Sequence, residues 1–160
     1  MHNVRSAHNA GSILRTAEGL GIDEVYLTGY TPYPESKRDK RLPHKRKKQA
    51  QQIHKTALGA EYFVEWHQAD DIDKILSDLK DQGFWLVALE QAKESAPLNR
   101  LKLRDNLALV VGNEITGLDK NVLKKVHELA QIPMAGRKES FNVAVATALA
   151  LYHLSYISSR

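Results

Sequence analysis

The sequence predicts an α/β domain with a mostly parallel sheet and helices on both faces. Short apolar runs alternate with helical patterns about five times along the chain, and no repeat or low-complexity tract interrupts them. Strands separated by helices favour parallel pairing, because a parallel connection needs a crossover long enough for a helix. Ligands of such sheets gather at the carboxyl ends of the strands.

The first predicted strand lies between two helices. Apolar residues recur at helical spacing in 10–21, and Gly21 stands where a glycine would end a helix. Residues 24–29 are rich enough in β-branched and aromatic side chains for a strand. Residues 47–59 again follow a helical pattern, which ends at Gly59.

The middle of the chain continues the alternation. Residues 61–66 are expected to form a strand, and 70–83 an amphipathic helix with acidic residues in its first turn. Residues 84–90 form an apolar run suited to a buried parallel strand.

In the last third, two strands and two helices are expected. We predict strands at 107–112 and 129–134, a short helix at 119–128, and a closing helix at 141–157. A strand would also be expected just before His2, so the first strand is either trimmed or absent.

Length and composition limit the function. A chain of 160 residues fits one domain, 1–160. The absence of cysteine excludes a disulfide framework, a Cys-ligated zinc and a thiol nucleophile. The seven histidines lack metal-ligand spacing, so no metal is expected. The longest apolar stretch, 143–151, is too short to span a membrane, and the start lacks a signal-peptide pattern. We therefore expect a soluble, cytoplasmic protein without a membrane partner.

The net charge of +4 hides a strongly basic segment. Residues 37–48, expected to be a loop, hold eight of the twenty-three Lys and Arg against a single Asp. Such a cluster is typical of a phosphate-contacting surface, although a solvated loop without a partner is the alternative. The residues expected to contact nucleic acid are Lys37, Arg38, Arg41, Lys45, Arg46, Lys47 and Lys48.

Two further stretches carry polar residues beside glycines. Asn9 and Arg15 lie six residues apart across a helix start, but an exposed helical Arg paired with Glu18 is the simpler interpretation of Arg15. In "VVGNEITGLD" an apolar strand runs into Gly112 and Glu114. This pattern favours a ligand loop, but it is not a phosphate-binding loop because the G-K-[ST] ending is missing. Glu114 fits a salt-bridged or helix-initiating carboxylate equally well.

The entrance of the closing helix is the third stretch. Ser140 is well placed to cap the helix. Asn142 has apolar neighbours that imply burial, and a buried Asn must find hydrogen-bond partners.

Together, "NAGSILR", "VVGNEITGL" and "IPMAGRKESFNVAVATALALY" resemble the three signature motifs of the SpoU (TrmH-like) branch of the SPOUT RNA methyltransferases, in the family's order. The resemblance implies a C-terminal deep trefoil knot, a homodimer and S-adenosyl-L-methionine as cofactor. It implies methyl transfer to a ribose 2′-hydroxyl of tRNA or rRNA. The cofactor-binding residues it implies are Leu89, Gly112, Ile132, Met134, Ser140 and Phe141. Its polar, catalytic set is Asn9, Arg15, Glu114, Ser140 and Asn142.

In the family the Arg of the first motif is thought to reach into the partner's cofactor site. A guanidinium stays protonated in proteins, so we assign Arg15 to holding a phosphate and stabilising the developing alkoxide instead of acting as a general base. Two alternatives stay open: a non-catalytic RNA-binding or ribosome-assembly module, and a small-molecule methyltransferase. The latter leaves the basic segment unexplained.

Overall fold

The computed structural model describes residues 1–36, 39–102 and 104–157 of the chain, so Lys37 and Arg38 lie outside the described residues. Every strand pair in the described part is parallel, as predicted, but the strands form two sheets instead of one. The two-stranded sheet holds β1 (Glu24–Thr28) and β2 (Glu65–Ala69). The four-stranded sheet has the order β4 (Ala96–Pro97), β6 (Glu128–Gln131), β3 (Trp85–Leu89), β5 (Leu107–Val110).

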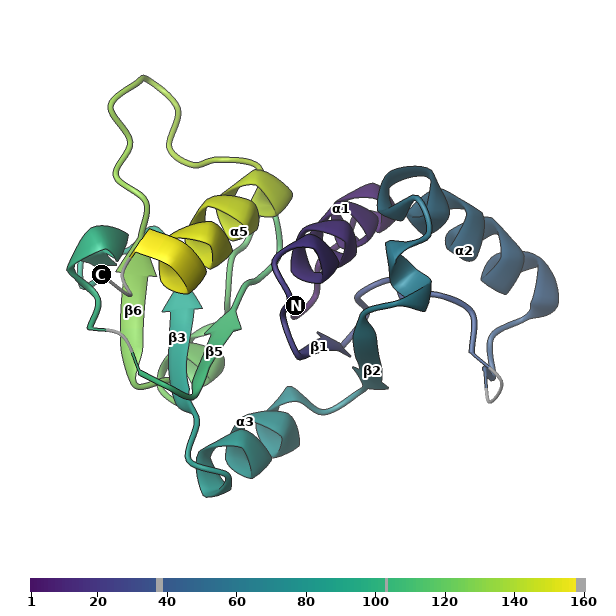
Figure 1. Ribbon diagram of the computed structural model, residues 1–160, viewed down its shortest axis with the longest axis horizontal. Coiled ribbons are helices and arrows are strands. Elements are labelled where there is room, and N and C mark those ends of the chain that lie inside the picture. Colours follow the sequence, from purple (N-terminus) through teal and green to yellow (C-terminus); the bar gives the residue numbers. More distant parts are fainter. Residues whose placement is uncertain (37–38, 103, 158–160) are drawn as a thin grey trace.

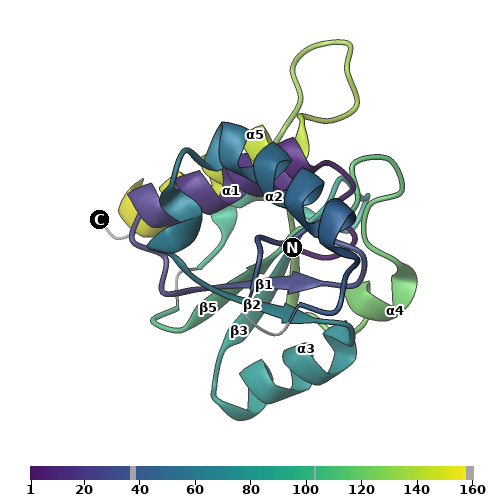
Figure 2. The same cartoon turned by 90° about the vertical axis from the view of Figure 1, so that its right-hand side faces the viewer.

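Helices cover both faces of the sheets, as predicted. Figures 1 and 2 show α1 (Ala7–Gly19), α2 (Pro43–Ala57) and α5 (Val143–Tyr152) on one side and α3 (Ile72–Asp81) on the other. The short helix α4 (Lys120–Leu123) packs into the same apolar cluster as α3. Two 3-10 turns, Ala60–Tyr62 and Leu98–Arg100, and a π-helical turn, His153–Ile157, complete the elements.

Several element boundaries differ from the sequence prediction. The predicted strand 61–66 is wrong: its first residues form the 3-10 turn, and the strand begins at Glu65. The buried carboxylate of Glu61 accepts the Gly59 N–H at 2.9 Å, which holds the chain in a turn at that point. The basic segment is a loop only in part, because α2 begins at Pro43, a residue suited to the first turn of a helix. Helix α4 is shorter than the predicted 119–128.

Gly11 serves a packing purpose between α1 and α2. A Cβ on Gly11 would lie 2.3 Å from the Ile53 carbonyl oxygen and 2.3 Å from Thr56 Oγ1. The missing Cβ of Gly11 therefore lets α1 and α2 pack closely against each other.

β6, the last strand in the sequence among the described residues, lies between β4 and β3, which both precede it in the chain. The trefoil knot stays a prediction that follows from the family resemblance. No helix in the described ranges is both long enough and apolar enough to cross a membrane.

Candidate functional site

A cavity of about 230 Å³ opens beside the carboxyl ends of β3, β5 and β6. Three segments far apart in the sequence form its wall: Leu89 to Gln91, Val111 to Gly117 and Gln131 to Ala146 each contribute residues. Gly112, Ile132 and Ser140 therefore share one cavity. Of the predicted cofactor-binding residues, the lining includes Leu89, Gly112, Ile132, Ser140 and Phe141, whereas Met134 lies outside it.

The turn after β5 needs both of its glycines. A Cβ on Gly112 would lie 2.7 Å from Leu118 Cγ. Gly117 has a φ of +66°, and a Cβ there would meet the Glu90 carboxylate at 2.4 Å. Asn113 closes the turn, since its Oδ1 accepts the N–H groups of Ile115 at 2.8 Å and Thr116 at 2.9 Å.

Glu90 is a site residue that the sequence reasoning missed. Its carboxylate accepts the Leu118 N–H at 2.8 Å, so it holds the turn at 112–117, which we call the glycine turn, against the end of β3. The available signal was its position directly after a buried strand, where parallel sheets place their functional side chains.

Three predicted polar residues form one hydrogen-bonded chain beside the cavity. Glu114 accepts the side-chain N–H of Asn9 at 2.9 Å, and Asn9 Oδ1 accepts the side-chain N–H of Asn142 at 3.2 Å. Glu114 also accepts the backbone N–H groups of Arg5 at 2.8 Å and Ser6 at 3.0 Å. The three motifs thus meet through side chains at the start of α1, the glycine turn and the start of α5.

Two opposing effects act on Glu114. Partial burial raises the pKa of its carboxyl, but the hydrogen bonds from Arg5, Asn9 and Ser6 outweigh burial and leave the pKa below its ordinary value of 4.5. Glu114 is therefore an ionised acceptor and not a proton donor at neutral pH.

The cap of α5 is Asn142, so the interpretation of Ser140 as the cap is wrong. Asn142 Oδ1 accepts the N–H of Ala144 at 2.9 Å and of Val145 at 3.4 Å. Asn142 is also exposed in the protomer, which contradicts the expected burial. Its apolar neighbour Val145 lies on a face of α5 that the protomer leaves partly open. Ser140 lines the cavity instead of capping the helix.

Arg15 differs from the other predicted polar residues, because it lies neither in the hydrogen-bonded chain nor at the cavity. It is exposed on α1 and lies outside the cavity lining. Among the described residues, no three His, Asp or Glu side chains come together as a metal site.

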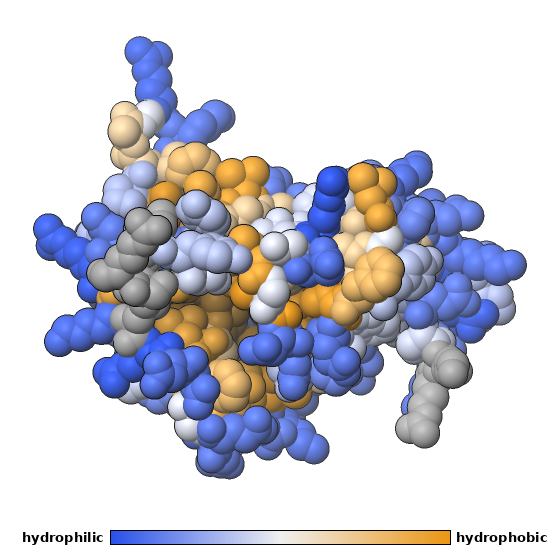
Figure 3. Space-filling view, viewed as in Figure 1, coloured by the Kyte–Doolittle hydropathy of each residue, from blue (hydrophilic) through white to orange (hydrophobic). Residues whose placement is uncertain are grey.

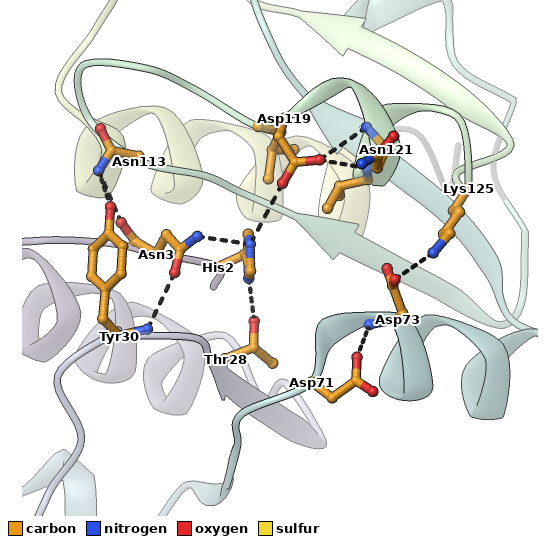
Figure 4. A network of polar contacts seen from close by, with 12 residues as sticks. His2, Asn3, Thr28, Tyr30, Asp71, Asp73, Asn113, Asp119, Asn121 and Lys125 are labelled. Atoms are coloured by element: carbon orange, nitrogen blue, oxygen red, sulfur yellow. Dashed lines mark hydrogen bonds and ion pairs between the residues drawn. The ribbon is translucent and has the colours of Figure 1, made fainter.

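The start of the chain connects the glycine turn to the two-stranded sheet (Figure 4). Asn113 donates to the Asn3 carbonyl at 3.1 Å and to the Tyr30 hydroxyl at 2.8 Å. Asn3 donates in turn to His2 Nε2 at 2.9 Å, and His2 Nδ1 lies 2.9 Å from Thr28 Oγ1. Burial lowers the pKa of His2, in accord with a neutral ring that accepts from Asn3.

Two of the predicted RNA-binding arginines are engaged within the protomer. Arg41 stacks on the Tyr33 ring at 3.6 Å and donates to Asp39 from Nε at 2.9 Å. Arg46 forms an ion pair with Glu35 at 2.7 Å. The lysines expected to contact RNA in this part of the chain are exposed near the start of α2: Lys45, Lys47 and Lys48.

Comparison with known proteins identifies the family. Residues 1–152 match the model of the SpoU rRNA Methylase family. A Staphylococcus aureus protein, which is named as a TrmH family tRNA/rRNA methyltransferase, is 30% identical over 154 residues, or 96% of this chain. The chain spans only 56% of the length of that relative.

Solved structures agree with this assignment. The AdoMet-bound rRNA methyltransferase of Sinorhizobium meliloti is 25% identical, with a TM-score of 0.80, over 96% of this chain and 53% of its own. A structure described as giving insight into 2-OH methylation of C/U34 on tRNA is also 25% identical, with a TM-score of 0.76, over 99% of this chain and 92% of its own. The second and third motifs line one cavity, and the first is hydrogen-bonded to both. Together with a family match over nearly the whole length, this leads to one conclusion: the chain belongs to the SpoU rRNA Methylase family.

Proposed function

We propose that this protein catalyses the transfer of a methyl group from S-adenosyl-L-methionine to a ribose 2′-hydroxyl of tRNA or rRNA in the cytoplasm. The observation that carries the proposal is a cavity at the carboxyl ends of the strands that the second and third motifs line, with Asn9 of the first motif hydrogen-bonded to Glu114 of that lining. The AdoMet bound to the Sinorhizobium meliloti relative and the 2-OH methylation named for the tRNA-modifying relative support it.

The lining of the cavity fits the proposed cofactor. Leu89, Ile132 and Phe141 provide apolar surface for an adenine ring. Gly112 completes this wall, and its missing Cβ lets the turn close against Leu118. When bound, AdoMet supplies a methyl group on a sulfonium centre. Ser140 and Glu139 place a hydroxyl and a carboxylate at the same wall, where they are positioned to orient polar groups of the cofactor or the ribose.

The polar chain has a positioning role in this proposal. Glu114 accepts hydrogen bonds from Asn9 and from the backbone at the start of α1, so it fixes the position of the first motif relative to the second. Arg15 is assigned to the acceptor side, where its guanidinium would hold the phosphate beside the target ribose and stabilise developing negative charge on the oxygen. Because Arg15 lies outside the cavity of its own protomer, the assignment places it in the site of a partner protomer.

A homodimer is the second part of the proposal. Four large apolar side chains on α5 and the following turn are about half exposed: Val145 (49%), Leu149 (45%), Tyr152 (53%) and Tyr156 (51%). They follow one another at helical spacing and therefore form a single stripe. Figure 3 shows apolar surface across the middle of the face on which α5 lies. Such a stripe is costly in water and favours burial against a second copy.

RNA binding by α2 is the third part. Leu42, the residue at the N-cap position, makes no side-chain capping bond, and Lys45, Lys47 and Lys48 lie near the positive end of the helix dipole. A cation in the first turn, here Lys45, is unfavourable by about 0.3–1 kcal/mol, and a bound phosphate would offset that cost. Figure 1 shows this end of α2 and the 132–142 loop at opposite ends of the protomer, so an RNA that contacts both sites must cross the molecule or the dimer.

Isothermal titration with AdoMet, followed by a methyl-transfer assay on total tRNA and rRNA, tests the activity. We expect AdoMet binding and transfer to the ribose 2′-oxygen. A chain that binds RNA but takes up no AdoMet at millimolar concentration is the non-catalytic module instead. A chain whose RNA affinity does not fall with added salt would contradict phosphate-driven binding.

Subunit mixing tests the assignment of Arg15 to the partner's site. Arg15→Ala should abolish transfer while AdoMet affinity stays nearly intact, and Ser140→Trp should block the cavity. If Arg15 acts across the dimer, a mixture of the two inactive variants regains activity, because half of the dimers then carry one intact site. The expected recovery is about one quarter of the wild-type rate. Recovery near zero, with heterodimers demonstrated, would place Arg15 in its own protomer's site.

A further inference from the structure

Three exposed side chains surround the cavity-lining residues Asn113 and Glu114 and have no role in the site as described so far. Tyr30 is 59% exposed, Ile115 is 74% exposed, and Arg5 is exposed as well. Ile115 belongs to the lining of the cavity, whereas Arg5 and Tyr30 lie outside that lining. We call Arg5, Tyr30 and Ile115 the rim cluster.

Hydrogen bonds fix the rim cluster against the glycine turn. The Asn113 side chain donates to the Tyr30 hydroxyl at 2.8 Å (Figure 4). The Oδ1 atom of the same side chain accepts the Ile115 N–H at 2.8 Å, so one amide holds both residues. The Arg5 N–H donates to the Glu114 carboxylate at 2.8 Å. Each member of the rim cluster is therefore one hydrogen bond away from a residue of the cavity wall.

The chain just after β1 places the Tyr30 ring. Gly29 has a φ of +64°, and a Cβ there would collide with the Asn3 side chain. Asn3 has a φ of +55°, a left-handed conformation that asparagine tolerates better than most residues, and its Oδ1 accepts the Tyr30 N–H at 3.2 Å. Tyr30 is thus held at its backbone and at its hydroxyl, while most of its surface faces solvent. Such a fixed aromatic ring loses little conformational entropy when it binds a ligand.

The cavity itself offers no positive charge to an RNA phosphate. Among the described residues, its lining holds no lysine or arginine but three glutamates: Glu90, Glu114 and Glu139. A phosphate beside the cavity must therefore find its positive charge outside the lining. Within the described part of the chain, the Arg5 guanidinium has no ion-pair partner, in contrast to Arg41 and Arg46. It is therefore a free cation next to the cavity wall.

A nucleotide whose ribose enters the cavity leaves its base and its flanking phosphates at the rim. Inside an RNA strand, the ribose has a phosphate on either side. Arg15 is assigned to one of these phosphates, which leaves the other for Arg5. Unpaired bases bind proteins by stacking on exposed aromatic rings, and the Tyr30 ring offers such a face. Ile115 extends the apolar surface on the other side of Asn113.

We propose that the rim cluster is the binding site of the acceptor nucleotide. The Tyr30 ring and Ile115 receive its base, and Arg5 pairs with an adjacent phosphate. This site rests on the proposed function, because it needs an RNA acceptor at the cavity. It also narrows the class of substrate: a base that stacks on Tyr30 is unpaired, so the target lies in a single-stranded loop or is turned out of a helix.

Paired variants test each interaction. Tyr30→Leu removes the aromatic face, whereas Tyr30→Phe keeps the face and removes only the hydroxyl. Arg5→Gln removes the charge, and Arg5→Lys keeps it. Tyr62→Leu and Arg100→Gln are the controls, because both residues are exposed and lie outside the cavity lining. The probe is total tRNA and rRNA from cells that lack this protein. KM and kcat for this RNA, its affinity as a function of salt, and the Kd for AdoMet are measured for every variant.

Tyr30→Leu should raise the KM for RNA at least about tenfold and change the Kd for AdoMet less than about twofold, while Tyr30→Phe stays within about threefold of the wild-type KM. Arg5→Gln should reduce the slope of log affinity against log salt by about 0.7–0.9, the amount expected for one phosphate, and Arg5→Lys should restore it. Tyr30→Leu with the KM of the wild type, or Arg5→Gln with its salt slope, overturns the proposal. The Arg5 side chain is exposed, so the Arg5 pair decides even where Tyr30→Leu loses stability.

The wild type separates a failure of this site from a failure of the proposed function. A wild-type protein that transfers no methyl group to RNA overturns both. A wild type that transfers it, with rim-cluster variants that behave like Tyr62→Leu and Arg100→Gln, overturns the acceptor site alone. Sedimentation equilibrium gives one further outcome. If Tyr30→Leu weakens self-association and leaves RNA affinity unchanged, the ring belongs to a subunit interface and the proposal is overturned.

Discussion

Removal of the Glu114 carboxylate tests whether the hydrogen-bonded chain organises the site. Glu114→Ala leaves the N–H groups of Arg5 and Ser6 and the side chain of Asn9 without their acceptor. An unpaired buried donor costs about 1–3 kcal/mol, and Glu114 is half-buried, so water replaces part of the loss. We therefore expect the free energy of unfolding to fall by about 2–3 kcal/mol, which lowers the melting temperature by about 4 to 12 °C.

Urea unfolding and thermal melting followed by circular dichroism measure this effect. Glu94→Ala, on the exposed surface, is the control and should change the free energy by less than about 0.5 kcal/mol. The lowered pKa of Glu114 adds a second criterion. A carboxyl with a lowered pKa stabilises the fold above its unfolded pKa, here about 4.5, and loses that contribution as the pH falls through its folded pKa. The difference between wild type and Glu114→Ala should therefore be full at pH 7 and smaller at pH 3. A Glu114→Ala protein that melts with the wild type at pH 7 would refute the reasoning.

Three further predictions concern packing, protonation and charge. Gly11→Ala should lower the free energy of unfolding by about 1–3 kcal/mol, because the new methyl group meets α2. Gly19→Ala in the same helix is the control, since its methyl group would meet nothing within 4 Å and should not destabilise the protein. Urea unfolding of both variants measures the difference. The pKa of His2 is lowered, so neutral His2 contributes to stability in full above the ordinary value of 6.5, and this contribution is lost as the pH falls below it. His2→Gln should therefore flatten the decline in the free energy of unfolding between pH 7 and 5. A decline as steep as that of the wild type would contradict this. Replacement of the lysines at 45, 47 and 48 by Gln should reduce the slope of log affinity against log salt for single-stranded RNA by up to about 2, and an unchanged slope would remove α2 from the RNA interface.

The parts of the fold that depend on local sequence were predictable. Helix α3 shows why: its apolar residues recur at helical spacing, Asp71 caps its start, and Gly83, with a φ of +84°, follows its end. The strand predicted at 61–66 failed because burial of a carboxylate, Glu61, decides the local structure there. Charged residues are rarely buried, so no sequence pattern indicates that contact.

The candidate site was predictable in its residues but not in its contacts. Asn9, Glu114 and Asn142 could be named from the motif resemblance. Their contacts could not, because Asn9 is more than a hundred residues away in the sequence from both of its hydrogen-bond partners, Glu114 and Asn142. Glu90 was missed because a single Glu after a strand has many structural roles. Its role becomes visible only when the glycine turn is seen to close against it.

The sequence by itself determined the alternation of strands and helices, the parallel pairing and the three motifs, because these depend on spacing and on the conformations that each residue type allows. The tertiary structure decided which side chains share the cavity and which arginines are already paired. Those features depend on the long-range placement of elements, and a pattern of neighbours along the chain carries no information about the distance between segments that meet only after folding.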